Sequence, residues 1–214
     1  MRRRWKASIC ERSPRANYSR RVASKPQVGV LALQGDVEEH LAALERAGAR
    51  GVAVKNRAAL DACAALVIPG GESTTVIRLL DRFALAEPLR ERVRAGMPLW
   101  GTCMGMIVVA CAVAGLDQPT LGLLDVTVRR NAFGRQNDSA EVELAIPVLG
   151  EPAYPAIFIR APWIESAGPT VEVLASYGEH GVMVRQGNVL GTSFHPELTE
   201  DPRVHRYFLG MLAP

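Results

Sequence analysis

Apolar residues in the first half of the chain are arranged in two alternating patterns. Short runs with the length and composition of buried strands occupy residues 28–33, 51–55, 64–69 and 98–101. Apolar residues at helical spacing fill segment 37–47, which Gly48 can end, two stretches within 73–94, and the run 104–114. Alternating strands and helices of these lengths predict a parallel sheet with helices on both faces.

The second half of the chain has a different pattern, with many short strands and few helices between them. Strands are expected at 125–129, 141–146, 156–160, 171–176, 182–185 and 188–194, and a last helix at 202–212. We therefore predict one α/β domain over residues 27–214, with an open, mostly parallel sheet and β-rich insertions in its second half.

Charge separates the first residues from the rest of the chain. Of the 25 Lys and Arg residues, nine lie within residues 1–25 beside a single acid, so this segment carries +8 and the remainder −5. We predict that residues 1–26 form a basic, disordered extension; an organelle transit peptide is the alternative. The acidic remainder does not indicate nucleic-acid binding, and no apolar run is long enough for a membrane span.

Cysteine usage indicates the compartment. Cys10, Cys63, Cys103 and Cys111 form no C-x-x-C pair and no dense framework, which favours a reducing, cytoplasmic setting over a disulfide scaffold. Cys63 and Cys111 are expected to be structural, with Cys111 buried inside the apolar helix 104–114.

Four motifs directly follow predicted strands. They are Gly35, Gly70-Gly71, Cys103 and His195. In an open parallel sheet, ligands bind beyond the carboxyl ends of the strands, so these motifs are expected to meet at one edge.

Gly101-Thr102-Cys103-Met104-Gly105 reads G-x-C-x-G between a strand and an apolar helix, which is the nucleophile-elbow pattern with Cys in place of Ser. Flanking glycines let the neighbouring backbone pack closely, and the helix N-terminus beside the sulfur favours a thiolate. A buried structural cysteine is the alternative interpretation.

His195 and Glu197 supply a base and its orienting carboxylate. At positions i and i+2 of an extended segment they would face the same side, and Pro196 favours that extended conformation. The pattern predicts a Cys103–His195–Glu197 triad. His40, His180 and His205 are expected to be surface or structural residues, because none has the spacing of a metal ligand set.

Several longer motifs occur in a fixed order along residues 28–212. They are Leu33–Asp36, Leu66–Thr75, Gly101–Cys103, Arg130–Gln136, Ile159–Pro162 and Ser193–Asp201. Together they resemble the class I, triad-type glutamine amidotransferases, and within them the glutaminase subunits of pyridoxal 5′-phosphate synthase. The PGGEST and FGRQ segments are more specific to that family than the triad.

The resemblance implies a flavodoxin-like sheet, hydrolysis of L-glutamine to L-glutamate and ammonia, and no metal or organic cofactor. The ammonia would pass through a tunnel to a pyridoxal 5′-phosphate synthase (lyase) subunit in a hetero-oligomer. By position, the family's glutamine-binding residues correspond to Gly71, Glu72, Ser73, Arg130, Ile159 and Arg160. The backbone N–H groups of Gly71 and Met104 would form the oxyanion hole.

Three other functions are compatible with parts of the pattern. They are a glutaminase serving another biosynthetic pathway, a catalytically silent module that regulates a synthase, and a stress-response protein with an elbow cysteine on a similar sheet. PGGEST and FGRQ argue against the first, the intact triad against the second, and His-x-Glu after the last strand against the third.

Overall fold

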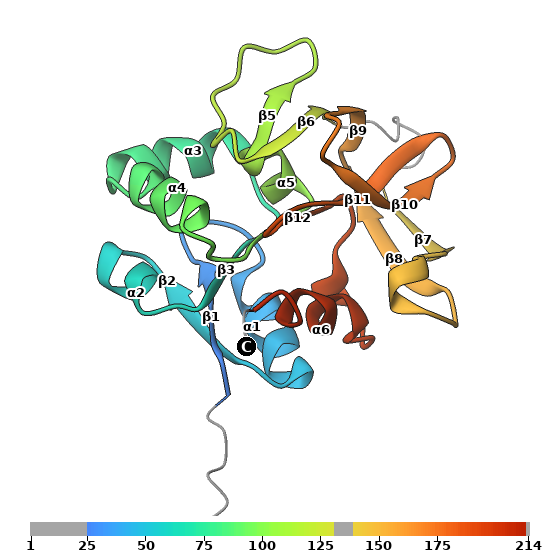
Figure 1. The fold of residues 1–214 in the computed structure, drawn as a ribbon, viewed down its shortest axis with the longest axis horizontal. Helices are drawn as coiled ribbons and strands as arrows, with labels where there is room; N and C mark the ends of the chain where they lie inside the picture. Colours follow the sequence, from blue (N-terminus) through green and yellow to red (C-terminus); the bar gives the residue numbers. More distant parts are fainter. Residues whose placement is uncertain (1–24, 131–138, 213–214) are drawn as a thin grey trace, which may run out of the picture.

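The computed structural model describes residues 25–130 and 139–212. In this part of the chain a ten-stranded sheet runs through the molecule and a two-stranded ribbon lies beside it (Figure 1). Of the predicted extension at residues 1–26, only Lys25 and Pro26 are among the described residues. Cys10 and residues 131–136 also lie outside the described part of the chain. No helix among the described residues combines the length and apolarity needed to cross a membrane.

Five parallel strands form the part of the large sheet that carries the site. In spatial order they are β2 (Arg50–Val54), β1 (Gln27–Leu31), β3 (Ala65–Ile68), β4 (Leu99–Thr102) and β12 (Val189–Thr192). Every residue of β3, β4 and β12 is buried, as expected for parallel strands covered on both faces. The predicted parallel sheet is confirmed.

The strands of the second half extend this sheet beyond β12, mainly in antiparallel pairs. They are β11 (His180–Gln186), β10 (Glu172–Tyr177), β9 (Trp163–Ala167), β6 (Leu124–Arg129) and β5 (Ala110–Val113). The separate ribbon pairs β7 (Ser139–Leu144) with β8 (Tyr154–Ile159). The β-rich second half is confirmed, although β9 was not predicted.

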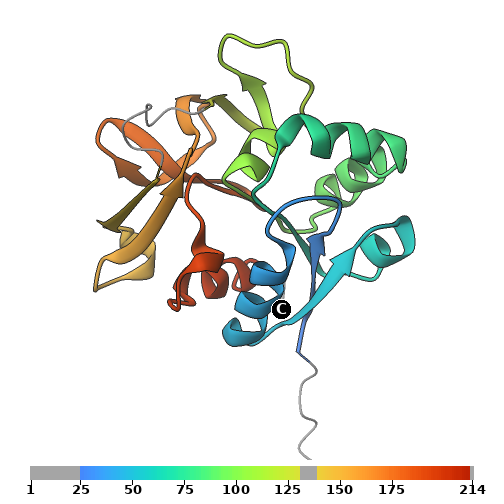
Figure 2. The ribbon, with the colours of Figure 1, turned by 180° about the vertical axis from the view of Figure 1, so that it is seen from behind.

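Helices cover both faces of the sheet (Figures 1 and 2). One face carries α1 (Val37–Ala47) and α6 (Arg203–Leu209); the other carries α3 (Ser73–Arg82), α4 (Ala86–Arg94) and α5 (Met104–Val109). Short turns of helix are α2 (Arg57–Asp61), η1 (Pro147–Leu149) and η2 (Pro196–Leu198). Alternation along β3 places Leu66 and Ile68 in the core under α3–α5, and Ala65 and Val67 in the core under α1 and α6.

The helix predicted for residues 104–114 is half as long as expected. Backbone ψ at Ala110 is 163°, so α5 ends at Val109 and the chain continues as β5, paired with β6. Cys111 therefore lies exposed on a strand, and the prediction that it is buried in a helix is wrong. The run Ile107–Val109 is apolar and β-branched, so its pattern does not separate a buried helix from a strand.

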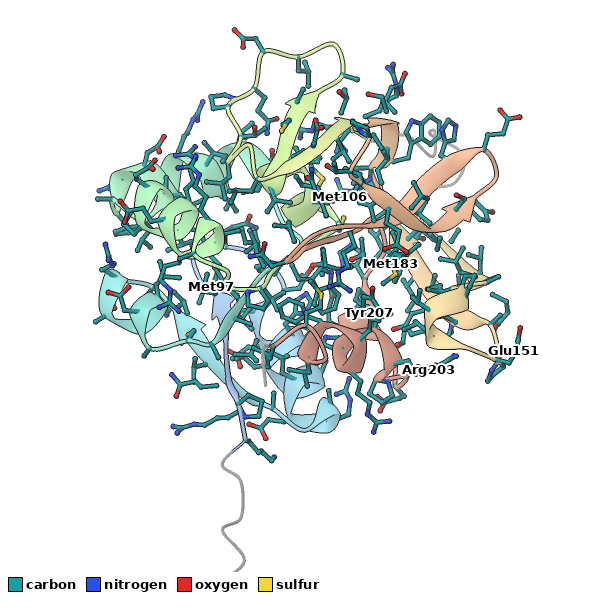
Figure 3. The ribbon with its side chains drawn as sticks, in the orientation of Figure 1. Met97, Met106, Glu151, Met183, Arg203 and Tyr207 are labelled. Atoms are coloured by element: carbon teal, nitrogen blue, oxygen red, sulfur yellow. The ribbon has the colours of Figure 1, made fainter. Side chains whose placement is uncertain are left out.

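Arg203 anchors α6 to the turn that precedes β8. Figure 3 shows its side chain beside the turn that carries Glu151. The guanidinium donates to the carbonyl oxygens of Gly150 at 3.1 Å and Pro152 at 2.6 Å, and it pairs with the Asp201 carboxylate at 2.6 Å. The ribbon is thereby fixed against the last helix.

Candidate active site

The turn between β4 and α5 has the geometry of a nucleophile elbow. Cys103 adopts φ 49° and ψ −115°, a strained conformation for a residue with a side chain, and its N–H donates to the Thr192 carbonyl of β12 at 2.7 Å. A Cβ on Gly101 would lie 2.5 Å from the carbonyl oxygen of Gly105, and one on Gly105 would overlap that of Ile68. The expected close packing around both glycines is confirmed.

The strand next to β4 carries the imidazole. β12 pairs in parallel with β4, and His195 follows three residues after its end. His195 Nδ1 lies 2.7 Å from Glu197 Oε1, and Glu197 is only 3% exposed. The predicted pairing forms, but the extended geometry was wrong, since Pro196 starts the 3₁₀ turn η2 that brings Glu197 back to the ring.

Charge on the imidazole is stabilised by its neighbours. Burial disfavours the protonated ring of His195, but interactions with Cys103 and Glu197 outweigh it and raise its pKa to about 10. Burial likewise acts to raise the pKa of Glu197, but His40 and His195 outweigh it and lower that pKa. At neutral pH the site thus holds a protonated imidazole between Cys103 and the carboxylate of Glu197.

A cavity of about 440 Å³ opens at this edge of the sheet. It is lined by Gln34, Asp36, Gly71, Glu72, Cys103, Met104, Arg130, Ile159, Arg160, His195 and Leu198. Cys103 Sγ lies 3.8 Å from the Ile159 carbonyl oxygen, which brings the β8 ribbon against the sulfur. All but two of the predicted site residues line this space.

The two exceptions lie behind the cavity wall. Glu197 contacts Nδ1 of His195. Ser73 is fully buried, and its hydroxyl accepts a hydrogen bond from Gln118 Nε2 at 3.0 Å. The Ser73 side chain is therefore held by Gln118 and does not line the cavity.

Arg130 is held in place by two acceptors. Its guanidinium contacts Glu72 Oε1 at 3.2 Å and Gln118 Oε1 at 3.1 Å, with 22% of the side chain exposed. Burial acts to raise the pKa of Glu72, but hydrogen bonds from Thr74 and the charge of Arg130 outweigh it and lower that pKa. A guanidinium positioned in this way suits a carboxylate ligand.

Backbone groups complete the cavity near the sulfur. Met104 is the first residue of α5, so its N–H has no partner within the helix. Gly71 lines the same cavity with φ 155°, and a Cβ there would collide with Gln34 Oε1. Arg160 also has a positive φ, of 44°.

Three lining residues were not predicted as site residues: Gln34, Asp36 and Leu198. Asp36 occupies the N-cap position of α1, but its side chain makes no capping hydrogen bond. Instead Oδ2 lies 3.6 Å from His195 Nδ1, and burial and Glu197 raise the pKa of Asp36 against the opposing effect of His195. Their position in the sequence could have identified Gln34 and Asp36 as site residues, because both follow β1 at the sheet edge where the site lies.

Asp36, His195 and Glu197 place their ligand-type atoms within 4.8 Å of one another. The proton on His195 Nδ1, shared with Glu197, occupies the lone pair that a metal would need, so this group fits an oriented imidazolium better. Of the other histidines, His180 stacks on Trp163 with ring centroids 3.6 Å apart, and His40 and His205 are buried.

Comparison with known proteins gives a consistent result. A family model described as the SNO glutamine amidotransferase family matches residues 30–213. The chain is 53% identical to "Pyridoxal 5′-phosphate synthase subunit PdxT" of Moorella thermoacetica over 187 residues, covering 87% of this chain and all of the relative. It is 57% identical to the protein of the same name from Frankia casuarinae, covering 87% and 94%. A solved structure titled "Crystal structure of glutamine amidotransferase" matches with a TM-score of 0.82 and 49% identity, covering 86% of this chain and 98% of that one.

Proposed function

The chain belongs to the SNO glutamine amidotransferase family, and on this premise we propose that it is the glutaminase subunit of pyridoxal 5′-phosphate synthase. It hydrolyses L-glutamine to L-glutamate and ammonia, and a synthase subunit in the same hetero-oligomer uses the ammonia. The observation that carries the proposal is the Cys103 elbow beside an imidazole that is oriented by a buried carboxylate.

Each residue has a distinct role in this chemistry. The Cys103 thiolate attacks the side-chain amide carbon of glutamine, and the backbone N–H groups of Met104 and Gly71 stabilise the oxyanion. His195, protonated in the resting site, donates its proton to the departing ammonia. His195 then activates the water that hydrolyses the thioester, while Glu197 keeps the ring oriented.

Substrate binding uses the outer part of the cavity. Arg130 pairs with the α-carboxylate of glutamine, and Glu72, beside Arg130 on the cavity wall, supplies a carboxylate for its ammonium group. Gly71, the backbone at Ser73, Ile159 and Arg160 complete the binding surface. Every step is carried by side chains and backbone of the chain itself.

We also propose that the protein acts in the cytoplasm. Support comes from the thiols of Cys63, Cys103 and Cys111, which are all free.

Glutamate release measured with and without purified synthase subunit tests the function. The wild-type chain releases glutamate, and Cys103→Ala abolishes release while still co-eluting with the synthase in size-exclusion chromatography. Cys111→Ala is the matched control, because it removes an exposed thiol on β5, and it retains activity. Glutamate release by Cys103→Ala at a rate near that of the wild type would refute the assignment.

A further inference from the structure

Glu197 has a second neighbour that the proposed chemistry does not use. His40, on α1, is fully buried, and its Nε2 lies 3.3 Å from Glu197 Oε2 and 3.0 Å from Thr102 Oγ1. Glu197 Oε1 is already occupied by His195 Nδ1 at 2.7 Å. The carboxylate is therefore placed between two imidazoles, one on each oxygen.

We propose that His40 is a positioning residue, whose Nε2–H fixes the carboxylate of Glu197 so that Oε1 stays directed at His195. The inference rests on the proposed function, since the orientation of His195 matters only for the reaction at Cys103. It extends the chain of contacts from the sulfur through His195 and Glu197 to α1.

The tautomer of His40 follows from its surroundings. Its Nδ1 is buried with no hydrogen-bond partner among the described residues. Both neighbours of Nε2 can accept a hydrogen bond, and the ionised carboxylate can only accept. The proton therefore belongs on Nε2, because a buried N–H left unpaired at Nδ1 is costly. There it is hydrogen-bonded to Thr102 Oγ1 and lies beside Glu197 Oε2, a buried oxygen with no hydrogen-bond partner of its own among the described residues.

A neutral His40 suits this role better than a charged one. Burial lowers its pKa, with His195 acting in the same direction, while Glu197, Asp36 and Glu39 act against it. His205, whose ring centroid lies 5.7 Å away, has a pKa lowered by burial to about 3 and adds no charge. The N–H dipole of a neutral His40 orients Glu197 without neutralising it. The negative charge of Glu197 then stabilises the protonated imidazole of His195.

A purely structural role is the competing explanation, because the ring of His40 also packs in the core. Its centroid lies 5.8 Å from that of Trp100 in an edge-to-face arrangement, and 5.7 Å from His205. His205 shares this aromatic cluster, with its ring centroid 5.0 Å from Trp100, but among the described residues the side-chain partners of Glu197 are His195 and His40, not His205. His205 is thus the matched control for packing without positioning.

The test compares His40→Leu, His40→Gln and His205→Leu in complex with the synthase subunit, by glutamate release and thermal melting. His40→Leu removes the donor and lowers kcat about 10–100-fold with KM for glutamine little changed, as for other groups that orient a functional imidazole from behind. His40→Gln, whose amide N–H can reach the position of Nε2, restores most of the lost kcat. His205→Leu keeps kcat close to that of the wild type, whatever its melting temperature.

The pH profile gives a readout that packing alone would not move. With Glu197 less well held, the pKa of His195 falls from its raised value, so the alkaline limb of kcat in His40→Leu shifts to lower pH. If His40→Leu does not fold, His40→Asn replaces it, because the shorter amide does not reach Oε2.

Three results would overturn the inference. The first is a kcat of His40→Leu, or of His40→Asn in its place, within twofold of the wild type, and the second is an equal loss of kcat in that variant and in His205→Leu. The third is a kcat of His40→Gln no higher than that of the variant without the donor. An inactive wild-type complex would instead refute the proposed glutaminase function.

Discussion

Glu197→Gln isolates the charge of the buried carboxylate while keeping its size. In the wild type, one carboxylate oxygen accepts from His195 Nδ1 at 2.7 Å and the other lies 3.3 Å from His40 Nε2. A glutamine offers one oxygen and one NH₂ group, so only one of the two imidazoles keeps an acceptor at position 197. The other meets a donor, and the imidazolium of His195 loses its counter-charge.

The expected loss in rate is large. Replacing the carboxylate of a catalytic triad by its amide typically lowers kcat about 10⁴-fold, because the imidazole is held in the wrong state. At 1.36 kcal/mol per factor of ten, a loss of about 10³–10⁴ in kcat corresponds to about 4–5.5 kcal/mol of transition-state stabilisation. Leaving a buried donor without an acceptor costs a further ~1–3 kcal/mol of folding free energy.

The stability difference also depends on pH. The pKa of Glu197 is lowered in the folded state, so its contribution to stability is present above the unfolded value of 4.5 and is lost as pH falls through the folded value. The gap in melting temperature between wild type and Glu197→Gln should therefore narrow in acid.

The assay is glutamate release at saturating glutamine in the complex with the synthase subunit. Glu200→Gln is the matched control, since its side chain is 92% exposed and it removes a charge three residues away. If kcat of Glu197→Gln stays within tenfold of the wild-type value and kcat of Glu200→Gln is unchanged, the negative charge of Glu197 does not contribute to catalysis.

Three further predictions concern the cavity and its frame. Arg130→Met should raise KM for glutamine about 10–100-fold with a smaller effect on kcat, because a hydrogen bond between charged groups is worth ~1.5–3 kcal/mol; unchanged KM would remove Arg130 from the binding site. Gly105→Ala should lower the free energy of unfolding, measured in denaturant melts, by ~1–3 kcal/mol, because the added Cβ overlaps the Ile68 carbonyl oxygen. The control Gly181→Ala should change the free energy of unfolding much less, because its Cβ would meet no neighbour closer than 3.4 Å. Glutamate release should hold through weakly alkaline pH and fall as pH rises through about 10, where His195 loses its proton; a fall centred near 6.5 would contradict the raised pKa.

The positions of the reacting groups were predictable because they depend on local rules. A cysteine between glycines after a strand, and His-Pro-Glu after another, need only the strand assignments to be placed at one sheet edge. The Cys103 elbow and the contact between His195 and Glu197 are both present.

The residues that were missed depend on tertiary contacts that leave no periodic signal. His40 reads as one polar residue on an amphipathic helix, yet its burial follows from how α1 packs across the end of β4. Asp36 has the sequence of a helix cap, and only the approach of His195 turns its carboxylate into the cavity. The true end of α5 depended on pairing with β6, which lies ten or more residues further along the chain.

The location of β4 and β12 at the centre of the sheet has a consequence for local opening. Their ladder pairs Thr102, directly before Cys103, with Thr192, three residues before His195. Cys103 and His195 therefore separate only when the core itself unfolds. Ile159 belongs instead to the two-stranded ribbon, in which β8 pairs with β7 and Ile157 of β8 also accepts a hydrogen bond from the backbone N–H of His195 at 2.8 Å. Amide hydrogens of β7, which lies on the far side of β8 from that bond, should therefore exchange through smaller openings than those of β4 and β12, while β8 stays beside the imidazole.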